Sequence, residues 1–443
     1  MRIAIAGMSS GVGKTSITIG MMKAFIDRGL TVQGFKCGPD FIDPSFHTHV
    51  TGRPSRNLDS WLLTASQLNN VLQHGSKDAA ISIIEGVMGY YDGKEPTSNI
   101  GSTAEICQIT NTPVLLVVDC WAVARSAAAI VKGFQMMKGG EMIVGVIANR
   151  VGSKGHYFLV KQAIEEECGV PVIGYLLHDS SFEMPERHLG LIPVVEQGNL
   201  DTLIGKLGQA VSETIDLDQI LLLAEKKQPE VSINIFEMIP KLDITIAVAR
   251  DAAFHFYYED NIQLLMARGA NIVYFSPLNN EEVPPGASGL YLGGGFPEVF
   301  ARELSNNDRT KASIQHLLEE GMPAIAECGG FMYLAESIET DEGVFPMVGI
   351  FKGTVKMNHQ LVEIGYREVM GSPQNPIFSN SLVKGQVFHH SSFTPLESIK
   401  PAYDPNGYQI HQTIAGYVHF HFLSCPRIID RWLVNAQLFK KRS

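Results

Sequence analysis

The sequence predicts an α/β protein with two domains, and two observations support this prediction. Short apolar segments typical of buried strands alternate with segments of helical spacing in both halves of the chain. A chain of 443 residues is also too long for one ordinary hydrophobic core, so we expect two domains of about 200 residues each. Hydrophobic residues make up 45% and charged residues 18% of the chain, as in ordinary globular proteins.

The first half contains the apolar segments of a parallel sheet that is covered on both faces. Its predicted strands are residues 2–6, 31–36, 79–85, 113–119, 142–149 and 171–176. Helical spacing predicts a helix over 15–28, and residues 200–224 are also expected to be helical. The mixed segment 226–239 predicts the domain boundary, with domains over residues 1–236 and 241–443.

The second half begins another α/β pattern. Its predicted strands are residues 244–249, 271–276, 289–292 and 323–327. Residues 344–412 are richer in glycine and in short strand-like segments, and 426–439 are expected to form a helix.

Charge and cysteine content narrow the class of protein. A net charge of −11 argues against a broad surface for nucleic acid or anionic membranes. The six cysteines include no C-x-x-C pair, which favours reduced thiols in a cytoplasmic protein over disulfides or a zinc site. The apolar stretch 112–131 is interrupted by Asp119 and Arg125, so we expect a strand and a helix there rather than a membrane span.

Residues 7–15 form a candidate phosphate-binding loop. Gly-Met-Ser-Ser-Gly-Val-Gly-Lys-Thr follows a predicted strand and opens a predicted helix. Backbone N–H groups of such a loop cradle phosphate oxygens, Lys14 supplies positive charge, and Thr15 can ligate Mg²⁺. The usual spacing wants glycine at position 8, where Met8 stands, one residue after Gly7. The predicted nucleotide-binding residues are Gly11, Gly13, Lys14, Thr15 and Ser16.

Acidic residues follow two further predicted strands. Asp40 and Asp43 lie after the second strand, and Glu85 ends the third in the position of a Walker-B acid, with Asp92 beyond it. Carboxylates at the carboxyl ends of parallel strands lie on the ligand side of an open sheet, and Mg²⁺ prefers one or two carboxylates with phosphate oxygens and water. Asp40 and Asp43 are candidates for metal or substrate binding, although Asp-Pro pairs also occur in turns.

Cys328 is the candidate nucleophile of the second half. It lies between the predicted strand 323–327 and the pair Gly329-Gly330, an arrangement typical of an exposed nucleophile at a strand-to-helix turn. A position at a helix N-terminus predicts a lowered thiol pKa. His419 and His421 alternate along a predicted strand, so we expect them on the same face, with His419 as the base.

Several segments together resemble the cobyrinate a,c-diamide synthases. They are 10–15, the block 35–47 with Gly-Pro-Asp, 52–59, the block 85–93 with Glu-Gly-Val-Met-Gly, and 185–191. The early glycine of the phosphate loop is also similar to the dethiobiotin synthetases. The resemblance implies an N-terminal P-loop, dethiobiotin-synthetase-like sheet domain and a C-terminal class I, triad-type glutamine amidotransferase domain.

The resemblance also implies an activity and a set of site residues. The first domain would bind MgATP and a corrinoid polycarboxylate and phosphorylate its a and c acetates. The second would release ammonia from L-glutamine, and amides would form in cobalamin biosynthesis. The implied catalytic residues are Cys328, His419, Asp40, Asp43 and Glu85; the implied metal ligands are Thr15, Asp40 and Glu85; and the implied substrate-binding residues are Asp92, Gly294, Gly295 and Gly329.

The chain departs from the family pattern at three places, and several alternatives stay open. Phe41 replaces the commoner tyrosine, His421 stands where the triad class often has glutamate, and Gln386-Val387 replaces the usual His-Glu beside His389. Hydrogenobyrinate or nickel-sirohydrochlorin a,c-diamide synthases would share these motifs, and a non-catalytic nucleotide-dependent protein is a further alternative. A homodimer is expected from the likeness. The sequence leaves open the metal of the tetrapyrrole, the order of the two amidations, an ammonia channel and the group that orients His419.

Overall fold

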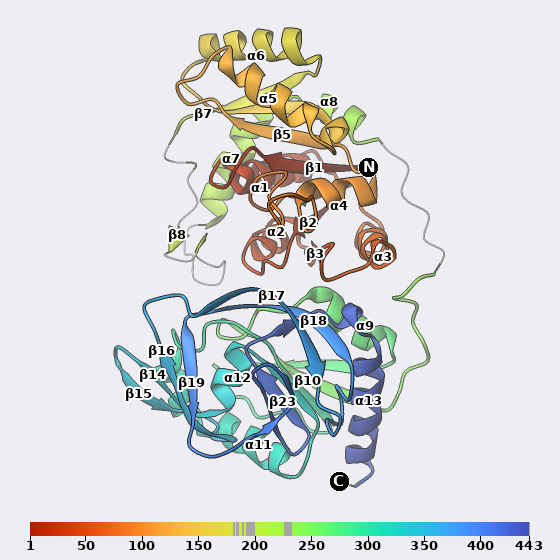
Figure 1. Cartoon of the computed structure of the whole chain (residues 1–443), viewed down its shortest axis with the longest axis vertical. Helices are drawn as coiled ribbons and strands as arrows, with labels where there is room; N and C mark the ends of the chain where they lie inside the picture. The colour runs from red at the N-terminus through yellow and green to blue at the C-terminus, as the bar shows by residue number, and fades with distance from the viewer. Residues whose placement is uncertain (180–181, 183–185, 188–189, 192–199, 226–232, 443) are drawn as a thin grey trace. The chain divides into compact units, whose positions relative to one another are not determined.

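The chain forms two compact units, residues 1–235 and 236–443. The structure is a computed structural model and describes residues 1–442 except 180, 181, 183–185, 188, 189, 192–199 and 226–232. Residues 185, 188 and 189 of the segment 185–191, which carries part of the family resemblance, and residues 226–232 of the predicted boundary segment 226–239 therefore lie outside the described residues. In Figure 1 the first unit runs from red through yellow to light green, and the second runs from green to blue.

The first unit contains a seven-stranded parallel sheet with the order β3-β2-β4-β1-β5-β6-β7. The strands are β1 (Arg2–Gly7), β2 (Val32–Cys37), β3 (Arg56–Leu58), β4 (Ile81–Glu85), β5 (Val114–Asp119), β6 (Ile143–Val151) and β7 (Val172–Leu177). A two-residue pair, β8 (Glu186–Arg187) and β9 (Gly190–Leu191), lies outside this sheet. The six predicted strands are confirmed, and the three-residue edge strand β3 is additional.

The helices of this unit connect and cover the strands (Figure 1). They are α1 (Lys14–Asp27), α2 (Asp43–Thr51), α3 (Ala65–Gly75), α4 (Thr103–Thr110), α5 (Ser126–Met136), α6 (Lys154–Cys168), α7 (Leu200–Thr214) and α8 (Leu217–Leu223), with a 3-10 turn η1 (Gly140–Met142). Side chains of α1, α7 and α8 form one core with those of the central strands, including Ile5, Met21 and Val211. This packing places the start of α1 directly beyond the end of β1.

The helical prediction for 200–224 is confirmed for 200–214 and 217–223, with a break at residues 215 and 216. The segment forms two helices, because Ile215 makes an isolated bridge to Gly174 and Asp216 starts a new helix by accepting a hydrogen bond from the backbone N–H of Gln219 (2.9 Å). An aspartate at an N-cap satisfies a backbone donor that would otherwise lack a partner.

The second unit contains a seven-stranded sheet with the order β11-β10-β12-β13-β23-β22-β20. The first five strands of that order are parallel to one another. Strand β22 is antiparallel to β23, and β20 is antiparallel to β22. The strands are β10 (Thr245–Ala249), β11 (Asn271–Phe275), β12 (Gly289–Leu292), β13 (Ala324–Glu327), β20 (Lys400–Pro401), β22 (Gly407–Ile410) and β23 (Thr413–Gly416). All four strands predicted between 244 and 327 are confirmed.

The strand-rich prediction for 344–412 is also confirmed, since two four-stranded sheets fill this part of the unit. Their strands are β14 (Ala335–Thr340), β15 (Gly343–Pro346), β16 (Phe351–Met357), β17 (Glu363–Gly371), β18 (Leu382–His389), β19 (Ser391–Pro395), β21 (Tyr403–Asp404) and β24 (His419–Phe420). The helices are α9 (Glu259–Ala267), α10 (Ala301–Asn306), α11 (Asp308–Glu319), α12 (Gly329–Leu334), α13 (Arg427–Lys440) and the 3-10 turn η4 (Phe422–Ser424).

The C-terminal helix α13 anchors this unit. Trp432 is fully buried, and its ring N–H donates to the carbonyl of Pro323 (3.2 Å), the residue before β13. Truncating a buried tryptophan to alanine costs about 3–5 kcal/mol. Among the described residues, no helix combines the length and apolar character needed to cross a bilayer.

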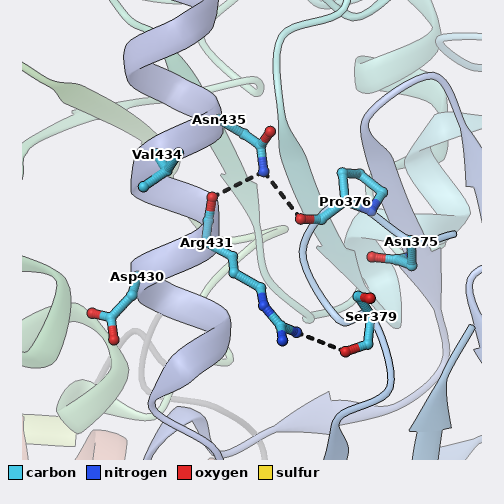
Figure 2. A pocket seen from close by; sticks show the side chains of 7 residues that line it. All are labelled: Asn375, Pro376, Ser379, Asp430, Arg431, Val434 and Asn435. Atoms are coloured by element: carbon cyan, nitrogen blue, oxygen red, sulfur yellow. Dashed lines mark hydrogen bonds between the residues drawn. The ribbon is translucent and has the colours of Figure 1, made fainter. Parts of the chain in front are cut away.

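A cavity of about 460 Å³ opens beside α13 (Figure 2). Its polar groups are used within the protein: Arg431 donates to the carbonyl of Ser379 (2.8 Å) and Asn435 to that of Pro376 (3.1 Å). None of the site residues predicted from the sequence lines it. The site residues predicted from the sequence lie elsewhere, many of them at the ends of the parallel strands.

Candidate functional site

The phosphate loop lies between β1 and α1, and its glycines meet specific steric demands. Gly13 has φ 88°, and a Cβ atom there would lie 2.3 Å from Nδ2 of Asn149. At Gly7 a Cβ atom would lie 2.6 Å from Val12 and 3.0 Å from Lys14. Gly7, one position earlier than in the usual spacing, is therefore needed because the side chains of Val12 and Lys14 pack against it.

Residues at the end of β6 support the loop from a distant part of the chain. The side-chain amide of Asn149 donates to the carbonyl of Val12 (2.7 Å), and Arg150 donates to the carbonyl of Gly11 (2.9 Å). Arg150 also forms an ion pair with Asp119 (2.8 Å). These residues could not be identified from the sequence, because nothing local to them indicates a contact with the loop.

The predicted nucleotide-binding side chains are only partly free for ligand. Lys14 donates to the carbonyl of Ser9 (3.0 Å) within the loop, and burial, followed by the charge of Lys36, lowers the pKa of Lys14 to about 8. Ser16 donates to the carbonyl of Phe182 (3.0 Å). Thr15 donates to Oε1 of Glu85 (2.6 Å), so the structure brings the loop and the predicted Walker-B acid together.

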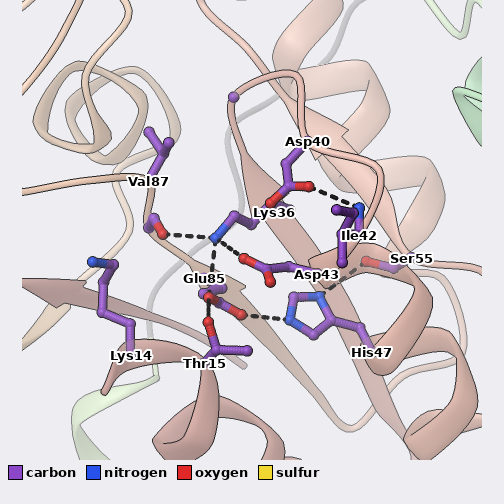
Figure 3. Close-up of polar contacts among 12 residues, drawn as sticks. Lys14, Thr15, Lys36, Asp40, Ile42, Asp43, His47, Ser55, Glu85 and Val87 are labelled. Atoms are coloured by element: carbon purple, nitrogen blue, oxygen red, sulfur yellow. Dashed lines mark hydrogen bonds and ion pairs between the residues drawn. The ribbon is translucent and has the colours of Figure 1, made fainter. Parts of the chain in front are cut away.

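Glu85 is the centre of a buried polar cluster (Figure 3). Its side chain is fully buried, and besides Thr15 it contacts Nζ of Lys36 (3.0 Å) and Nε2 of His47 (2.7 Å). Burial alone would raise the pKa of this carboxyl, but the charge of Lys36 and the hydrogen bond of His47 outweigh burial and lower it. His47 contacts this carboxylate directly, from helix α2.

Lys36 is the functional candidate that the sequence analysis missed. From the end of β2 its ammonium reaches Oδ2 of Asp43 (2.5 Å), Oε1 of Glu85 and the carbonyl of Gly86 (3.1 Å) (Figure 3). Burial opposes its charge, yet the two carboxylates outweigh burial and raise the pKa of Lys36. Its position inside the Gly-Pro-Asp block at a strand end was the signal that could have identified it.

Asp43 and Asp40 differ in their surroundings. Burial and the neighbouring charge of Glu85 raise the pKa of Asp43 well above its usual value, since one lysine cannot fully compensate two carboxylates. Asp40 Oδ1 accepts the backbone N–H of Ile42 (2.7 Å), which shapes the turn into α2. Asp92 likewise accepts the backbone N–H of Gly89 (2.8 Å), in a loop where Met88 has φ 47°.

The cluster fits a magnesium ion held mainly by phosphate. Thr15 and Glu85 place two hard oxygen atoms 2.6 Å apart beside the loop, and Asp43 adds a carboxylate that Lys36 only partly compensates. Among the described residues, no group of three or more acidic, histidine or cysteine side chains is arranged to hold a metal alone. Mg²⁺ usually keeps one or two protein ligands with phosphate oxygens and water, so this donor set suits it.

Cys328 lies at the predicted strand-to-helix turn of the second unit. It has φ 47° between β13 and α12, and its backbone N–H donates to the carbonyl of Gly416 (2.7 Å). A Cβ atom at Gly330 would lie 2.3 Å from the carbonyl of Leu292, so this glycine is required for the turn to pack on β12. The nucleophile elbow predicted from the sequence is thus present in its backbone geometry.

The glycines predicted to bind substrate lie beside Cys328. A Cβ atom at Gly329 would lie 3.0 Å from the backbone nitrogen of Gly295, and one at Gly294 would lie 2.2 Å from Cε1 of His419. Gly295 has φ 153°, and a Cβ atom there would lie 2.0 Å from the carbonyl of Ala253. The imidazole of His419, the loop of residues 293–295 and the turn at Cys328 therefore lie close together.

The predicted lowering of the Cys328 pKa is wrong for the ligand-free protein. Burial, followed by the charge of Glu298, raises the pKa of the thiol to about 12, although the N–H of Gly329 acts in the opposite direction. Burial and the nearby His389 lower the pKa of His419 to about 3. The two groups are therefore a neutral thiol and a neutral imidazole near pH 7.

His421 does not take the place of the triad glutamate. Strand β24 ends at Phe420, so alternation along a strand does not extend to His421, whose ring packs 4.7 Å from Tyr258. Neither ring nitrogen of His421 has a hydrogen-bond partner within the described part of the chain. His389, to which the sequence assigned no role, stacks on Tyr417 (3.8 Å between ring centres) and contacts Glu363 (3.3 Å).

Comparison with known proteins matches both halves of the chain. Residues 3–192 match the CobQ/CobB/MinD/ParA nucleotide binding domain, and residues 245–426 match the CobB/CobQ-like glutamine amidotransferase domain. The first unit is therefore a nucleotide-binding domain, and the second is a glutamine amidotransferase domain, as the fold class predicted from the sequence requires.

Relatives cover almost the whole chain. A cobyrinate a,c-diamide synthase from Priestia megaterium is 51% identical over 450 residues, covering 99% of this chain and 98% of the relative. Enzymes of the same name from Streptococcus sanguinis and Picrophilus torridus are 42% and 41% identical, and each alignment covers 97% of this chain and at least 97% of the relative. The chain is thus a glutamine-dependent amide ligase, and it belongs to the family of cobyrinate a,c-diamide synthases.

Proposed function

We propose that this protein amidates the a- and c-acetate carboxylates of cobyrinic acid in cobalamin biosynthesis, with MgATP and with ammonia released from glutamine. The supporting observation is the buried cluster in which Glu85 contacts both Thr15 of the phosphate loop and Lys36. The relatives that cover almost the whole chain are named cobyrinate a,c-diamide synthases. In this proposal residues 1–236 bind ATP and the corrinoid, and residues 241–443 are the glutaminase.

The ligase chemistry follows from the poor leaving group of a carboxylate. An acetate oxygen attacks the γ-phosphorus of ATP, the bond to the bridging oxygen breaks, and an acyl phosphate and ADP form. Ammonia then attacks the carbonyl carbon, the C–O bond breaks, phosphate leaves with the electron pair, and the added nitrogen loses a proton to give the amide. Lys14 and Lys36 supply positive charge where charge shifts during phosphoryl transfer.

The acidic residues serve binding and positioning in this proposal. Thr15 and Glu85, with Asp40, would hold Mg²⁺, and the bound ion would neutralise phosphate charge. Asp43 keeps Lys36 at the strand end through their 2.5 Å contact. Asp92 shapes the loop that borders the substrate, because it accepts the N–H of Gly89.

The glutaminase chemistry uses the neutral pair of the second unit. His419 takes the proton of the Cys328 thiol as sulfur attacks the side-chain amide carbon of glutamine, and the N–H groups of Gly295 and Gly329 stabilise the oxyanion. The C–N bond then breaks with proton transfer from His419, which releases ammonia. Water hydrolyses the thioester to glutamate, while Gly294 leaves room for the imidazole.

Mass spectrometry of the product tests the proposal. Purified protein receives MgATP with cobyrinate, hydrogenobyrinate or nickel-sirohydrochlorin, and either glutamine or an ammonium salt. We expect cobyrinate to gain two amides, and we expect Cys328→Ser to amidate with ammonium but not with glutamine. Amidation of another tetrapyrrole in place of cobyrinate would keep the mechanism and overturn the substrate.

From the family likeness we also propose a homodimer. We propose a cytoplasmic location, since ATP and glutamine are supplied there. Light scattering of the purified protein tests the dimer: a mass near twice 48.6 kDa supports it and a mass near 48.6 kDa contradicts it.

A further inference from the structure

The base-bearing segment of the amidotransferase unit lies beyond the sheet that carries the nucleophile. Strand β23 pairs with β13 in parallel as far as Gly416, which is opposite Glu327. The chain then leaves this sheet and forms β24, which pairs with β18 at the edge of a different, four-stranded sheet. Backbone pairing to β13 therefore does not extend to His419, so another group must connect the two catalytic segments.

The side chain of Glu327 makes that connection. Its Oε1 accepts the backbone N–H of Phe420 (3.1 Å), the residue after His419, while Glu327 itself directly precedes Cys328. Its Oε2 accepts the hydroxyl proton of Tyr291 (3.0 Å) on β12. One buried carboxyl group thus joins the backbone on which the nucleophile stands to the backbone on which the base stands.

Asn261 of α9 completes the support from the same side. Its side-chain amide donates to the carbonyl of Phe420 (2.7 Å) and to the hydroxyl of Tyr291 (3.2 Å), and its Oδ1 accepts the N–H of Phe422 (2.8 Å). Both backbone polar groups of Phe420 are therefore held by buried side chains. A residue fixed on both sides has little freedom to rotate, so the neighbouring imidazole is fixed as well.

We propose that Glu327 is the positioning residue for His419, and that it acts through the backbone of Phe420 in a chain that has His421 at the usual position of the triad glutamate. It is a positioning residue rather than a catalytic one, because its contacts are to Phe420 and Tyr291 and not to a reacting atom. The inference rests on the roles proposed above for Cys328 and His419.

The environment of the carboxyl group agrees with this role. Burial raises the pKa of Glu327 to about 8, and the hydrogen bonds from Phe420 and Tyr291 oppose that rise. The titratable groups that face it are Tyr257, Tyr291, Tyr403 and Cys328. A group that holds a backbone N–H needs an acceptor oxygen and no charge, so a glutamine side chain should replace it.

The test measures glutamine hydrolysis by the full-length protein without tetrapyrrole. The variants are Glu327→Ala, Glu327→Gln and Tyr291→Phe, with Glu336→Ala as a control at an exposed position of β14. We expect Glu327→Ala to lower kcat about 100-fold with little change in KM, because a small misplacement of a catalytic group costs that much. Glu327→Gln should stay within about threefold of wild type, and Tyr291→Phe should lie between them.

A second readout separates positioning from general loosening. The rate at which iodoacetamide modifies Cys328, followed by peptide mass spectrometry at pH 7.5, should fall in Glu327→Ala, since a displaced imidazole can no longer take the thiol proton as the sulfur attacks. Faster modification would mean that the elbow has opened, and would overturn the proposal. Ammonium-supported amidation and the thermal unfolding transition show whether each variant is folded.

The remaining outcomes are also decisive. Wild-type kcat in Glu327→Ala would overturn the proposal, as would an equal loss in Glu327→Gln, which would show that charge matters rather than the acceptor. If Glu327→Ala does not fold, a loss of kcat in folded Tyr291→Phe supports the proposal and an unchanged kcat overturns it. If Cys328→Ser or His419→Ala still hydrolyses glutamine, the roles assigned under the proposed function fail instead.

Discussion

In the nucleotide-binding unit, the buried ionic groups lie beside groups of opposite charge, whereas in the amidotransferase unit the groups proposed to react are buried without charge. Lys36 lies between Asp43 and Glu85, and its pKa is raised. Cys328 and His419, in contrast, have their pKa values shifted by burial toward the neutral thiol and the neutral imidazole.

The difference corresponds to the two reactions proposed above. Phosphoryl transfer moves negative charge between oxygen atoms, so a site with fixed positive charge can stabilise it before substrate arrives. Thiol attack on an amide moves a proton from sulfur to an imidazole, so a neutral pair creates charge only during the reaction. The two units therefore prepare for chemistry in opposite ways, and changes that affect one should leave the other active.

The largest expected effect is that of Lys36→Met. The substitution leaves two buried carboxylates without their cation, and removing one partner of a buried ion pair destabilises by about 3–5 kcal/mol. We expect amidation to fall about 10³-fold with glutamine and with ammonium alike, because positive charge at the transferring phosphoryl group is lost. Glutamine hydrolysis should stay near wild type.

Lys23→Met is the matched control, because Lys23 pairs with Asp27 on the exposed side of α1. It should leave both activities unchanged. Equal loss of amidation in the two lysine variants, or full amidation in Lys36→Met, would contradict a role for the buried pair.

A smaller effect is expected for Gly294→Ala in the other unit. The added Cβ would lie 2.2 Å from Cε1 of His419, so the imidazole must move. We expect kcat for glutamine hydrolysis to fall about 100-fold, with ammonium-supported amidation retained. Gly205→Ala, at an open helical position, should change neither rate, and wild-type hydrolysis by Gly294→Ala would show that the imidazole need not occupy this place.

Per pH unit, the smallest expected effect is on stability at low pH. Burial lowers the pKa of His421 to about 3, so between about pH 6.5 and pH 3 the unfolded chain binds a proton that the folded chain does not. Stability should therefore fall with falling pH, by about 1.4 kcal/mol per pH unit for this group. Urea unfolding of His421→Phe should show a decline shallower by that amount, and parallel curves would contradict the burial of a neutral ring.

The sequence predicts what local pattern determines and misses what distant residues impose. The apolar strands and the glycines around Lys14 and Cys328 identify both turns, because strand, turn and helix are contiguous there. Lys36 was missed because its partners Asp43 and Glu85 lie on other elements. The direction of the Cys328 pKa shift was wrong because burial is a property of the folded unit, which outweighs the N-terminus of the six-residue helix α12.

The helix break at Asp216 has a similar cause. Apolar spacing continues from 200 to 224, and only the bridge between Ile215 and Gly174 shows where the helix must stop. Asn149 illustrates the same limit at the phosphate loop, since its contact with Val12 spans 137 residues.

The pH dependence of Cys328 modification in the ligand-free protein tests the contrast between the two units most directly. Iodoacetamide modification is followed at the Cys328 peptide from pH 6 to pH 10, with exposed model thiols in parallel. The neutral, buried thiol predicts a rate that still rises above pH 9, after the model thiols, with their pKa of about 8.5, have begun to level off. A rate that reaches its plateau below pH 7 would show a thiolate-imidazolium pair and contradict the account.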